Sequence, residues 1–310
     1  MKLNTFQKTA VITLCATFGL IFVGGLVRVA GAGLGCPDWP RCFGFWLPPF
    51  SAADLPDGYD PSSFNVFKTW MEYVNRLVGV IVGFFIMITF ILSFRFFRTN
   101  TLVFFGAGAA FVLVLFQGWL GGQVVRSGLE SWMITIHMVV AVVIINVLIW
   151  TVFRSMHDRL RLSMDSDLQR KLLMLLPLLI AVVVIQVIFG SQVREGIEEV
   201  RSLYPLLERG EWIANVGTID LVHRSFSWLV LGLVASFQFL VLSKNGGFCL
   251  SLTAMITTIA TLLQLILGAG LVYLDFPPAF QVFHLLNATI MTSAPFFALL
   301  IVLHSKSGAK

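Results

Sequence analysis

Eight long apolar stretches dominate the 310-residue chain and constrain its fold more than any other feature. Each is long enough for the roughly 20 apolar residues with which an α-helix crosses a bilayer. Hydrophobic residues make up 57% of the chain and charged residues 12%, with a mean hydropathy of +0.89. Water-soluble, disordered and disulfide-scaffold proteins do not have this composition. We predict an all-α integral membrane protein with transmembrane helices over about 10–30, 72–94, 102–125, 131–153, 172–193, 219–242, 248–273 and 279–303.

Charged residues are unevenly distributed between the two ends of these helices. An even number of helices puts both termini on one side of the membrane. That side carries 12 of the 21 Lys and Arg residues but 3 of the 16 Asp and Glu residues. Because cytoplasmic connections are enriched in Lys and Arg, we expect both termini in the cytoplasm. The net charge of +5 then follows from membrane topology and does not indicate nucleic-acid binding.

The first helix and the connection after it differ from the rest. The first stretch resembles a signal peptide, but it is long and Arg28 follows it without a clear cleavage site, so we expect an uncleaved helix. The connection from about residue 30 to residue 70 is the longest in the chain and is rich in Pro, Asp and Gly. This composition predicts an ordered loop with turns.

The chain contains an internal repeat at an offset of 147 or 148 residues. The recurring residues are Asn75-Arg76 and His223-Arg224, Gln117 and Gln264, Gly121 and Gly268, and His137 and His284. Four helices separate the copies, so both have the same orientation in the membrane. We predict two pseudo-symmetric parallel four-helix bundles, an N-terminal domain over residues 1–160 and a C-terminal domain over residues 161–310.

Two histidines of the C-terminal half are candidate metal ligands. His223 and His284 each lie four or five residues inside a predicted helix that begins on the outer side. At 1.5 Å per residue they lie at matched depth, roughly 6–8 Å from the helix starts. Paired imidazoles in one bundle suit axial ligation of a haem iron. The alternative for either histidine alone is a polar residue that packs between helices.

The N-terminal half has one histidine where the repeat predicts two. His137 corresponds to His284, but Asn75 stands where the repeat predicts a histidine. If a haem binds in this half, we expect one firm axial ligand and one open or weak position, and an open face can admit oxygen. The alternatives are that this half has lost its haem, or that Asn75 hydrogen-bonds between helices.

A carboxylate precedes each of the paired positions by three residues. Glu72 and Asn75 therefore share a helix face, as do Asp220 and His223. The functional hypothesis makes Glu72 a proton relay or general acid/base at the edge of a haem pocket. The alternative is an acid that stabilises a helix N-terminus.

Glutamine and glycine recur one turn apart before the histidine-bearing helices. Gln117, Gln186 and Gln264 each precede a Gly by four residues, whereas Leu20 precedes Gly24. Glycine permits the close approach of a helix or a flat macrocycle, and plain helix packing is the simpler interpretation.

Several arginines lie on the outer side against the positive-inside trend, which indicates anionic partners. Haem propionates are candidates because guanidinium pairs with carboxylate in a bidentate manner, and lipid phosphate is the alternative. These candidate cofactor-binding residues are Arg28, Arg76, Arg126, Arg194 and Arg224.

Cys36 and Cys42 flank Pro37-Asp38-Trp39-Pro40-Arg41 in the first outer loop. Because that side is oxidising, they could form a structural disulfide. The alternative is a thiol pair that passes electrons or forms a mixed disulfide.

Together these residues resemble the haem A synthase family over nearly the whole chain. The resemblance is carried by the eight helices in two halves, the loop Gly35–Cys42, Glu72-x-x-Asn75-Arg76, His137, His223-Arg224 and His284. It implies an oxidoreductase that converts the methyl group of haem O to the formyl group of haem A for terminal oxidase biogenesis.

The resemblance also implies a role for each site residue. His223 and His284 would bind a b-type haem, His137 the iron of the substrate haem O, and Glu72 would be catalytic, while the cysteine pair corresponds to Cys36 and Cys42. The family's usual first histidine is Asn75 here, and the outer loop around residues 195–211 has no cysteine pair. We interpret the chain as a variant with an open iron position in its N-terminal half.

Two rival functions remain at this point. The first is a b-type cytochrome subunit that transfers electrons without modifying haem, and the second is a parallel-repeat transporter with helices broken at mid-membrane. For the main hypothesis we expect a bacterial plasma membrane protein. Its expected partners are haem O, an unidentified electron donor, haem O synthase or oxidase assembly factors, and a further copy of the chain.

Overall fold

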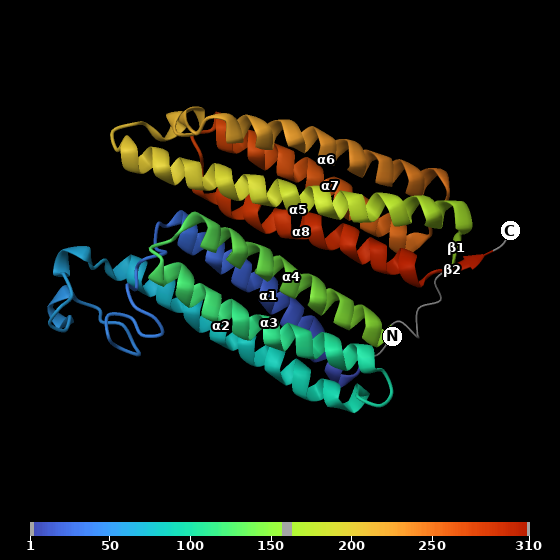
Figure 1. The fold of residues 1–310 in the computed structure, drawn as a ribbon, viewed down its shortest axis with the longest axis horizontal. Coiled ribbons are helices and arrows are strands. Elements are labelled where there is room, and N and C mark those ends of the chain that lie inside the picture. Colours follow the sequence, from blue (N-terminus) through green and yellow to red (C-terminus); the bar gives the residue numbers. More distant parts are fainter. Residues whose placement is uncertain (1–2, 157–162, 309–310) are drawn as a thin grey trace. The chain divides into compact units, whose positions relative to one another are not determined.

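A computed structural model describes residues 3–156 and 163–308, and long helices account for most of them (Figure 1). Within these ranges, eight helices are long and apolar enough to cross a membrane. This confirms the predicted all-α fold with eight transmembrane helices. The predicted domain boundary between residues 160 and 161 lies outside the described ranges.

The first compact unit extends to Val152. Its elements are α1 (Thr5–Val29), η1 (Ala52–Asp54), η2 (Pro61–Ser63), α2 (Val66–Ser93), η3 (Phe94–Phe96), α3 (Thr101–Arg126) and all but the last turn of α4 (Ser131–Met156). One core cluster joins buried residues of α2, α3 and α4, including Ile86, Ala110 and Leu148, and Leu14 of α1 packs against it. The four helices therefore form a bundle around a shared apolar interior.

The second compact unit runs from Phe153 onward. Its elements are β1 (Ser163–Asp165), α5 (Ser166–Leu203), η5 (Arg209–Glu211), η6 (Ile213–Asn215), α6 (Thr218–Ser243), α7 (Phe248–Tyr273), α8 (Pro278–His304) and β2 (Lys306–Gly308). Each helix packs against two others, in the cyclic order α5, α6, α7, α8. Strands β1 and β2 pair in parallel beside the start of α5 and the end of α8 (Figure 1).

Several helix boundaries extend past the apolar stretches from which they were predicted. Helix α2 begins at Val66 instead of near 72, because the Asn65 side chain accepts a hydrogen bond from the Lys68 amide at 3.0 Å. Helix α5 begins at Ser166 instead of near 172, with Asp165 as its N-cap, and continues to Leu203 instead of ending near 193. Caps and charged pairs sustain helix outside the bilayer, where hydropathy gives no signal.

The connection between α1 and α2 is an ordered loop with turns, as predicted. Two short 3-10 helices lie within it, and the Ser51 and Asp60 side chains cap them. The corresponding connection between α5 and α6 covers residues 204–217, so it is shorter than predicted, because the last turns of α5 occupy residues 194–203.

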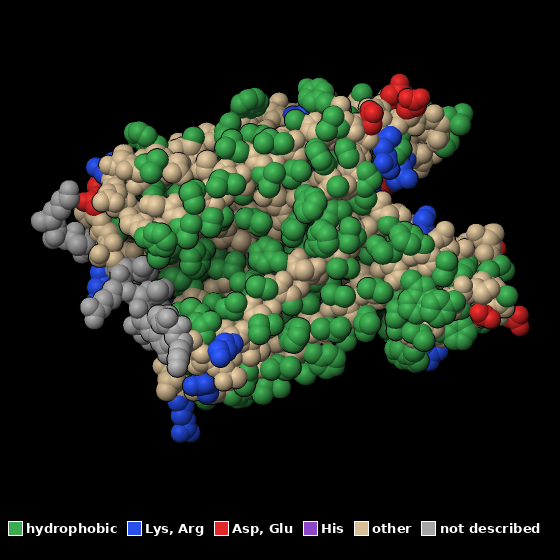
Figure 2. All heavy atoms as spheres, turned by 180° about the vertical axis from the view of Figure 1, so that it is seen from behind, with side chains coloured by type: hydrophobic (Ala, Val, Ile, Leu, Met, Phe, Trp, Pro, Cys, Tyr) green, Lys and Arg blue, Asp and Glu red, His purple; other side chains and the backbone are tan. Residues whose placement is uncertain are grey.

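Apolar side chains cover the helix surfaces between their ends. Figure 2 shows hydrophobic side chains along the helices of each unit and Lys, Arg, Asp and Glu near helix ends and loops. The exposed apolar residues include Phe105, Val112, Trp228 and Phe239. This pattern is expected for helices that contact lipid. Helices α5 and α8 continue through Pro177 and Pro295, so these two helices lack the mid-membrane break that the transporter hypothesis predicts.

Candidate functional site

The second unit brings together the two histidines that the repeat singled out. His223 is the sixth residue of α6 and His284 the seventh of α8, so they lie at similar depth. Their ring centroids are 6.5 Å apart and their planes are inclined at 63°. An iron ion between two imidazoles requires roughly 6.4 Å between ring centres, from about 2 Å per metal–nitrogen bond and about 1.2 Å from nitrogen to ring centre. The observed spacing fits this geometry.

The donor set favours a macrocycle over a bare metal ion. Within residues 3–156 and 163–308, no group of three or more His, Cys, Asp and Glu side chains could hold a metal ion. Two imidazoles therefore suit an iron whose four equatorial ligands come from a porphyrin. The Nδ1 atoms of His223 and His284 are buried and have no hydrogen-bond partner among the described residues, although each residue as a whole is half-buried. The accessible part of each side chain lies away from Nδ1.

A glycine on the preceding helix lies beside each of these rings. A Cβ atom added to Gly190 of α5 would lie 3.0 Å from His223 Cε1, and one added to Gly268 of α7 would lie 3.4 Å from His284 Cε1. The glycines thus provide flat helix surfaces against which the imidazoles rest. Side chains larger than hydrogen would displace the ring, most of all at Gly190.

The first unit repeats this arrangement around His137. This residue is the seventh of α4, and a Cβ atom on Gly121 of α3 would lie 3.4 Å from its Cε1 atom. On α2, Asn75 faces α1, where a Cβ atom on Gly24 would lie 3.9 Å from its Oδ1 atom. That Oδ1 atom is buried and accepts no hydrogen bond from the residues described. The position equivalent to His223 thus retains the glycine surface but presents an amide.

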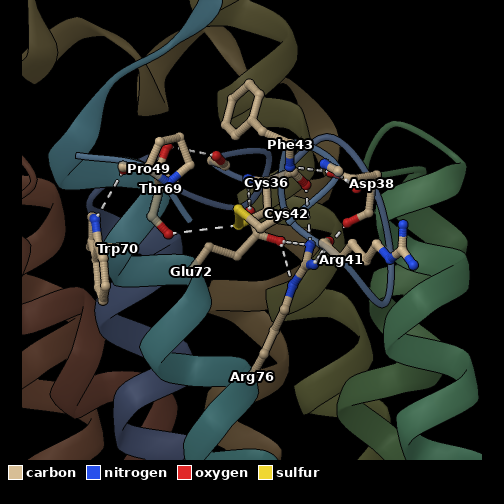
Figure 3. The surroundings of a disulfide bond; sticks show 12 residues. Cys36, Asp38, Arg41, Cys42, Phe43, Pro49, Thr69, Trp70, Glu72 and Arg76 are labelled. Atoms are coloured by element: carbon tan, nitrogen blue, oxygen red, sulfur yellow. Dashed lines mark hydrogen bonds and ion pairs between the residues drawn. A yellow bond between two sulfur atoms is a disulfide. The ribbon is translucent and has the colours of Figure 1, made fainter. Parts of the chain in front are cut away.

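Glu72 lies where α2 meets the loop that joins α1 to α2 (Figure 3). It is buried and pairs with Arg76 one turn along the helix. Its Oε2 atom accepts a hydrogen bond from the Cys36 amide at 2.8 Å, and its Oε1 atom accepts one from Arg76 Nε at 3.1 Å. The carboxylate therefore anchors the loop to α2 through both oxygens.

Arg76 binds the same loop with the rest of its guanidinium group. Its Nη1 atom donates to the Asp38 and Arg41 carbonyl oxygens at 2.7 and 2.9 Å, and its Nη2 atom donates to the Cys36 carbonyl at 3.1 Å. Nε and Nη2 also donate to Glu72. These contacts use the five N–H donors of an arginine, so this conformation leaves none for a further anion.

The two loop cysteines form a disulfide bond, in agreement with the structural alternative. Cys36 and Cys42 are 0% and 1% exposed, so the bond is inaccessible in the closed loop. The Asp38 carboxylate accepts hydrogen bonds from the Phe43 and Gly44 amides at 2.5 and 2.9 Å, which shapes the turn after the bond. Sequence reasoning missed this role of Asp38, because an acid inside a Cys-flanked loop gives no sign of its partners.

The loop reaches across to α3 through Trp39. A Cβ atom on Gly122 would lie 2.8 Å from the Trp39 ring, and the Arg126 guanidinium lies 6.0 Å from the centre of that ring. Gly122 directly follows Gly121, which lies beside His137. The loop therefore contacts α3 at the level of the His137 imidazole, and Trp39 is a site residue that sequence analysis missed.

The other candidate arginines differ in their surroundings. Arg194 pairs with Glu198, and its Nη1 atom is buried without a partner among the described residues. Arg224 pairs with Asp220, and 45% of its side chain is exposed. Arg28 Nη1 lies 3.3 Å from the Met138 sulfur. Of these residues, Arg194 presents a buried donor and Arg224 an exposed charge to an anionic group.

Comparison with known proteins relates this architecture to one family. The family model described as "Cytochrome oxidase assembly protein" matches residues 7–295. The chain is 26% identical to the heme A synthase of Nitrosospira multiformis, over 90% of this chain and 88% of that protein. It is 27% identical to the heme A synthase of Shewanella oneidensis, over 83% and 76% of the two chains, and 23% identical to that of Flavobacterium johnsoniae, over 91% and 93%.

Proposed function

Because the chain belongs to the cytochrome oxidase assembly protein family and is a multi-pass membrane protein, we propose that it is a haem A synthase. In this proposal it oxidises the methyl group of haem O to the formyl group of haem A by successive hydroxylation, and the resulting gem-diol loses water. The observation that carries the proposal is the 6.5 Å separation of the His223 and His284 rings on facing helices.

We assign the b-type haem to the second unit. His223 and His284 would hold this haem through its iron, with Gly190 and Gly268 leaving room beside each imidazole. A haem held by two histidines would supply one-electron transfer. The buried Nη1 donor of Arg194 and the exposed guanidinium of Arg224 suit propionate groups, which pair with arginine through charge-assisted hydrogen bonds.

We assign the substrate haem O to the first unit. His137 would hold the substrate iron on one side, where Gly121 supports the ring. Asn75 would face the other side, and its amide is a weak ligand that leaves the position open to oxygen. Arg28 and Arg126 lie at the outer ends of α1 and α3 and are the propionate candidates of this unit.

Glu72 would act as a general acid/base at the edge of the substrate site. Its carboxylate is held by Arg76 and by the Cys36 amide, which orients it. An ionised carboxylate can accept the proton released when the substrate methyl is oxidised. Arg76 would orient Glu72 and the loop, since its five donors are already engaged, and its role toward a propionate requires a different rotamer.

Localisation and partners follow from the same proposal. The excess of cations on the side of the termini supports cytoplasmic termini in a bacterial plasma membrane. The disulfide of the first outer loop suits the opposite, oxidising side. An electron donor, haem O synthase, oxidase assembly factors and a second copy of the chain are the partners we expect.

The proposal is tested by haem extraction from a host that makes haem O but has no haem A synthase of its own. Expression of this chain should yield haem A, identified by mass. The Glu72→Gln variant should retain bound b-type haem but accumulate haem O. If the wild-type chain binds haem but yields no haem A, it is an electron-transfer cytochrome and the proposal is wrong.

A further inference from the structure

Each of the three histidines receives a second contact from the helix that precedes it. Gln117 Nε2 donates to the His137 carbonyl oxygen at 3.0 Å, Gln186 Nε2 to that of His223 at 2.9 Å, and Gln264 Nε2 to that of His284 at 3.1 Å. In every case the glutamine lies one turn before the glycine that faces the same imidazole. Three helix pairs thus share one arrangement, which we call the glutamine–glycine clamp.

The clamp fixes a helix at the level of its histidine. A backbone carbonyl in a helix already accepts a bond from the amide four residues later, so the glutamine adds a second bond on the free side of that oxygen. This bond sets how far one helix slides and turns against the other. The glycine then contacts the ring at Cε1, and together the two contacts determine where the imidazole points.

The fourth helix pair supplies a comparison within the same chain. Helices α1 and α2 pack closely and keep the glycine, with Gly24 beside Asn75. Leu20 occupies the glutamine position and has no side-chain donor. This pair is joined elsewhere, by Thr13 Oγ1, which donates to the Phe85 carbonyl oxygen at 3.2 Å, ten residues beyond Asn75 on α2. Joining two neighbouring helices therefore does not require a glutamine at the level of position 75. The glutamine is absent where the histidine is absent, so its role is tied to the imidazole.

The C-terminal clamp has an additional support. Asn287, one turn beyond His284 on α8, donates to Gln264 Oε1 at 2.7 Å and to the Ala260 carbonyl at 2.7 Å. The corresponding Oε1 atoms of Gln117 and Gln186 are buried and have no partner among the described residues. Gln264 is therefore held at both ends of its amide, whereas Gln186 is held at one.

We propose that Gln117, Gln186 and Gln264 are positioning residues that, with their glycines, orient the haem-ligating imidazoles. The inference rests on the proposed haem ligation and adds residues that act through the ligands. The two glutamines of the second unit control the orientation of the axial rings of the b-type haem, and Gln117 that of the ring facing the substrate haem.

The test compares two glutamine variants of the purified, haem-loaded protein. Gln186→Leu removes the bond to His223 while keeping a side chain of similar size. Gln238→Leu is the matched control, because Gln238 Oε1 also joins two helices of this unit, accepting from Thr258 Oγ1 at 3.1 Å, but contacts no histidine. The measurements are the electron paramagnetic resonance spectrum of the ferric haem, which reports axial ring orientation, and the rate of haem loss to an acceptor protein.

We expect Gln186→Leu to shift the low-field g value. It should also accelerate haem loss by about two- to tenfold, which is the change in rate that the loss of one hydrogen bond produces. Gln238→Leu should match the wild type in both measurements. An unchanged spectrum and rate for Gln186→Leu would overturn the clamp, and so would equal changes in both variants. Should Gln186→Leu fail to accumulate, Gln264→Leu serves instead with the same expectations. A wild-type protein without low-spin haem would overturn the proposed function as well, so the two failures are distinguishable.

Discussion

Replacement of Arg76 by methionine should open the disulfide loop. Arg76 and Glu72 are 16% and 5% exposed at their side chains, so their pair is largely shielded from water. Removal of one partner from such a pair costs about 3–5 kcal/mol, because the other charge stays buried without its counter-ion. Opening of the loop exposes Glu72 to water and relieves this cost. The penalty should therefore appear as a larger open fraction, by about 10²- to 10⁴-fold at 1.4 kcal/mol per tenfold.

The rate of disulfide reduction measures this opening, because Cys36 and Cys42 are buried in the closed loop. Cys15 and Cys249 are free, so both are first replaced by serine. A small dithiol is then added to the detergent-solubilised protein and new thiols are counted with time. When closure is faster than reduction, the rate follows the open fraction. Arg76→Met should be reduced at least a hundredfold faster than the wild type.

The equivalent arginine of the second unit provides the control. Arg224 pairs with Asp220 and is 45% exposed. It lies in the second unit, whereas the disulfide loop belongs to the first. Arg224→Met should leave the reduction rate of Cys36–Cys42 unchanged. The double variant Glu72→Gln with Arg76→Met should be slower than Arg76→Met alone, since it leaves no buried charge. Equal reduction rates for Arg76→Met and the wild type would refute the view that this ion pair holds the loop closed.

The remaining predictions concern the glycine surfaces and the substituted ligand. Gly190→Ala should change the spectrum of the bound haem without lowering the melting temperature of the protein, because its Cβ atom would press on His223 at 3.0 Å while alanine favours the helix. Gly268→Ala, at 3.4 Å, should change the spectrum less, and the reverse order would contradict the contact argument. Asn75→His should convert haem reconstituted in the first unit from high-spin to low-spin. Adding Leu20→Gln to this variant should raise the low-spin fraction further. A high-spin spectrum in both variants would show that an imidazole at position 75 does not pack against Gly24 in the orientation needed to bind iron.

The apolar stretches predicted the fold because a bilayer leaves few alternatives to a helix. Their ends were predicted less well. The first turns of α5 contain three charged residues, Asp167, Arg170 and Lys171. Their low hydropathy placed the predicted start of the helix after them, whereas ion pairs at 3.3 and 2.7 Å stabilise the helix there. Helix continuation in water depends on capping and pairing, which a count of apolar residues does not include.

The candidate site was predicted in its residue types but only partly in its contacts. Sequence spacing placed His223 and His284 at similar depth, and the structure places their rings together. The repeat also revealed Gln186 and Gly190 as a pair, but their partner His223 lies on another helix, and a one-dimensional pattern does not show which faces meet. Arg76 illustrates the same limit, since its loop carbonyl partners carry no side-chain signature.

The central claim is that His223 and His284 hold one haem between them in the second unit. The most direct measurement is the visible spectrum and haem content of the purified protein, for the wild type and for the His223→Ala and His284→Ala variants. The account predicts a low-spin b-type spectrum in the wild type and its loss in each variant, while the variants still insert into the membrane. A low-spin spectrum that persists in both variants would contradict the account.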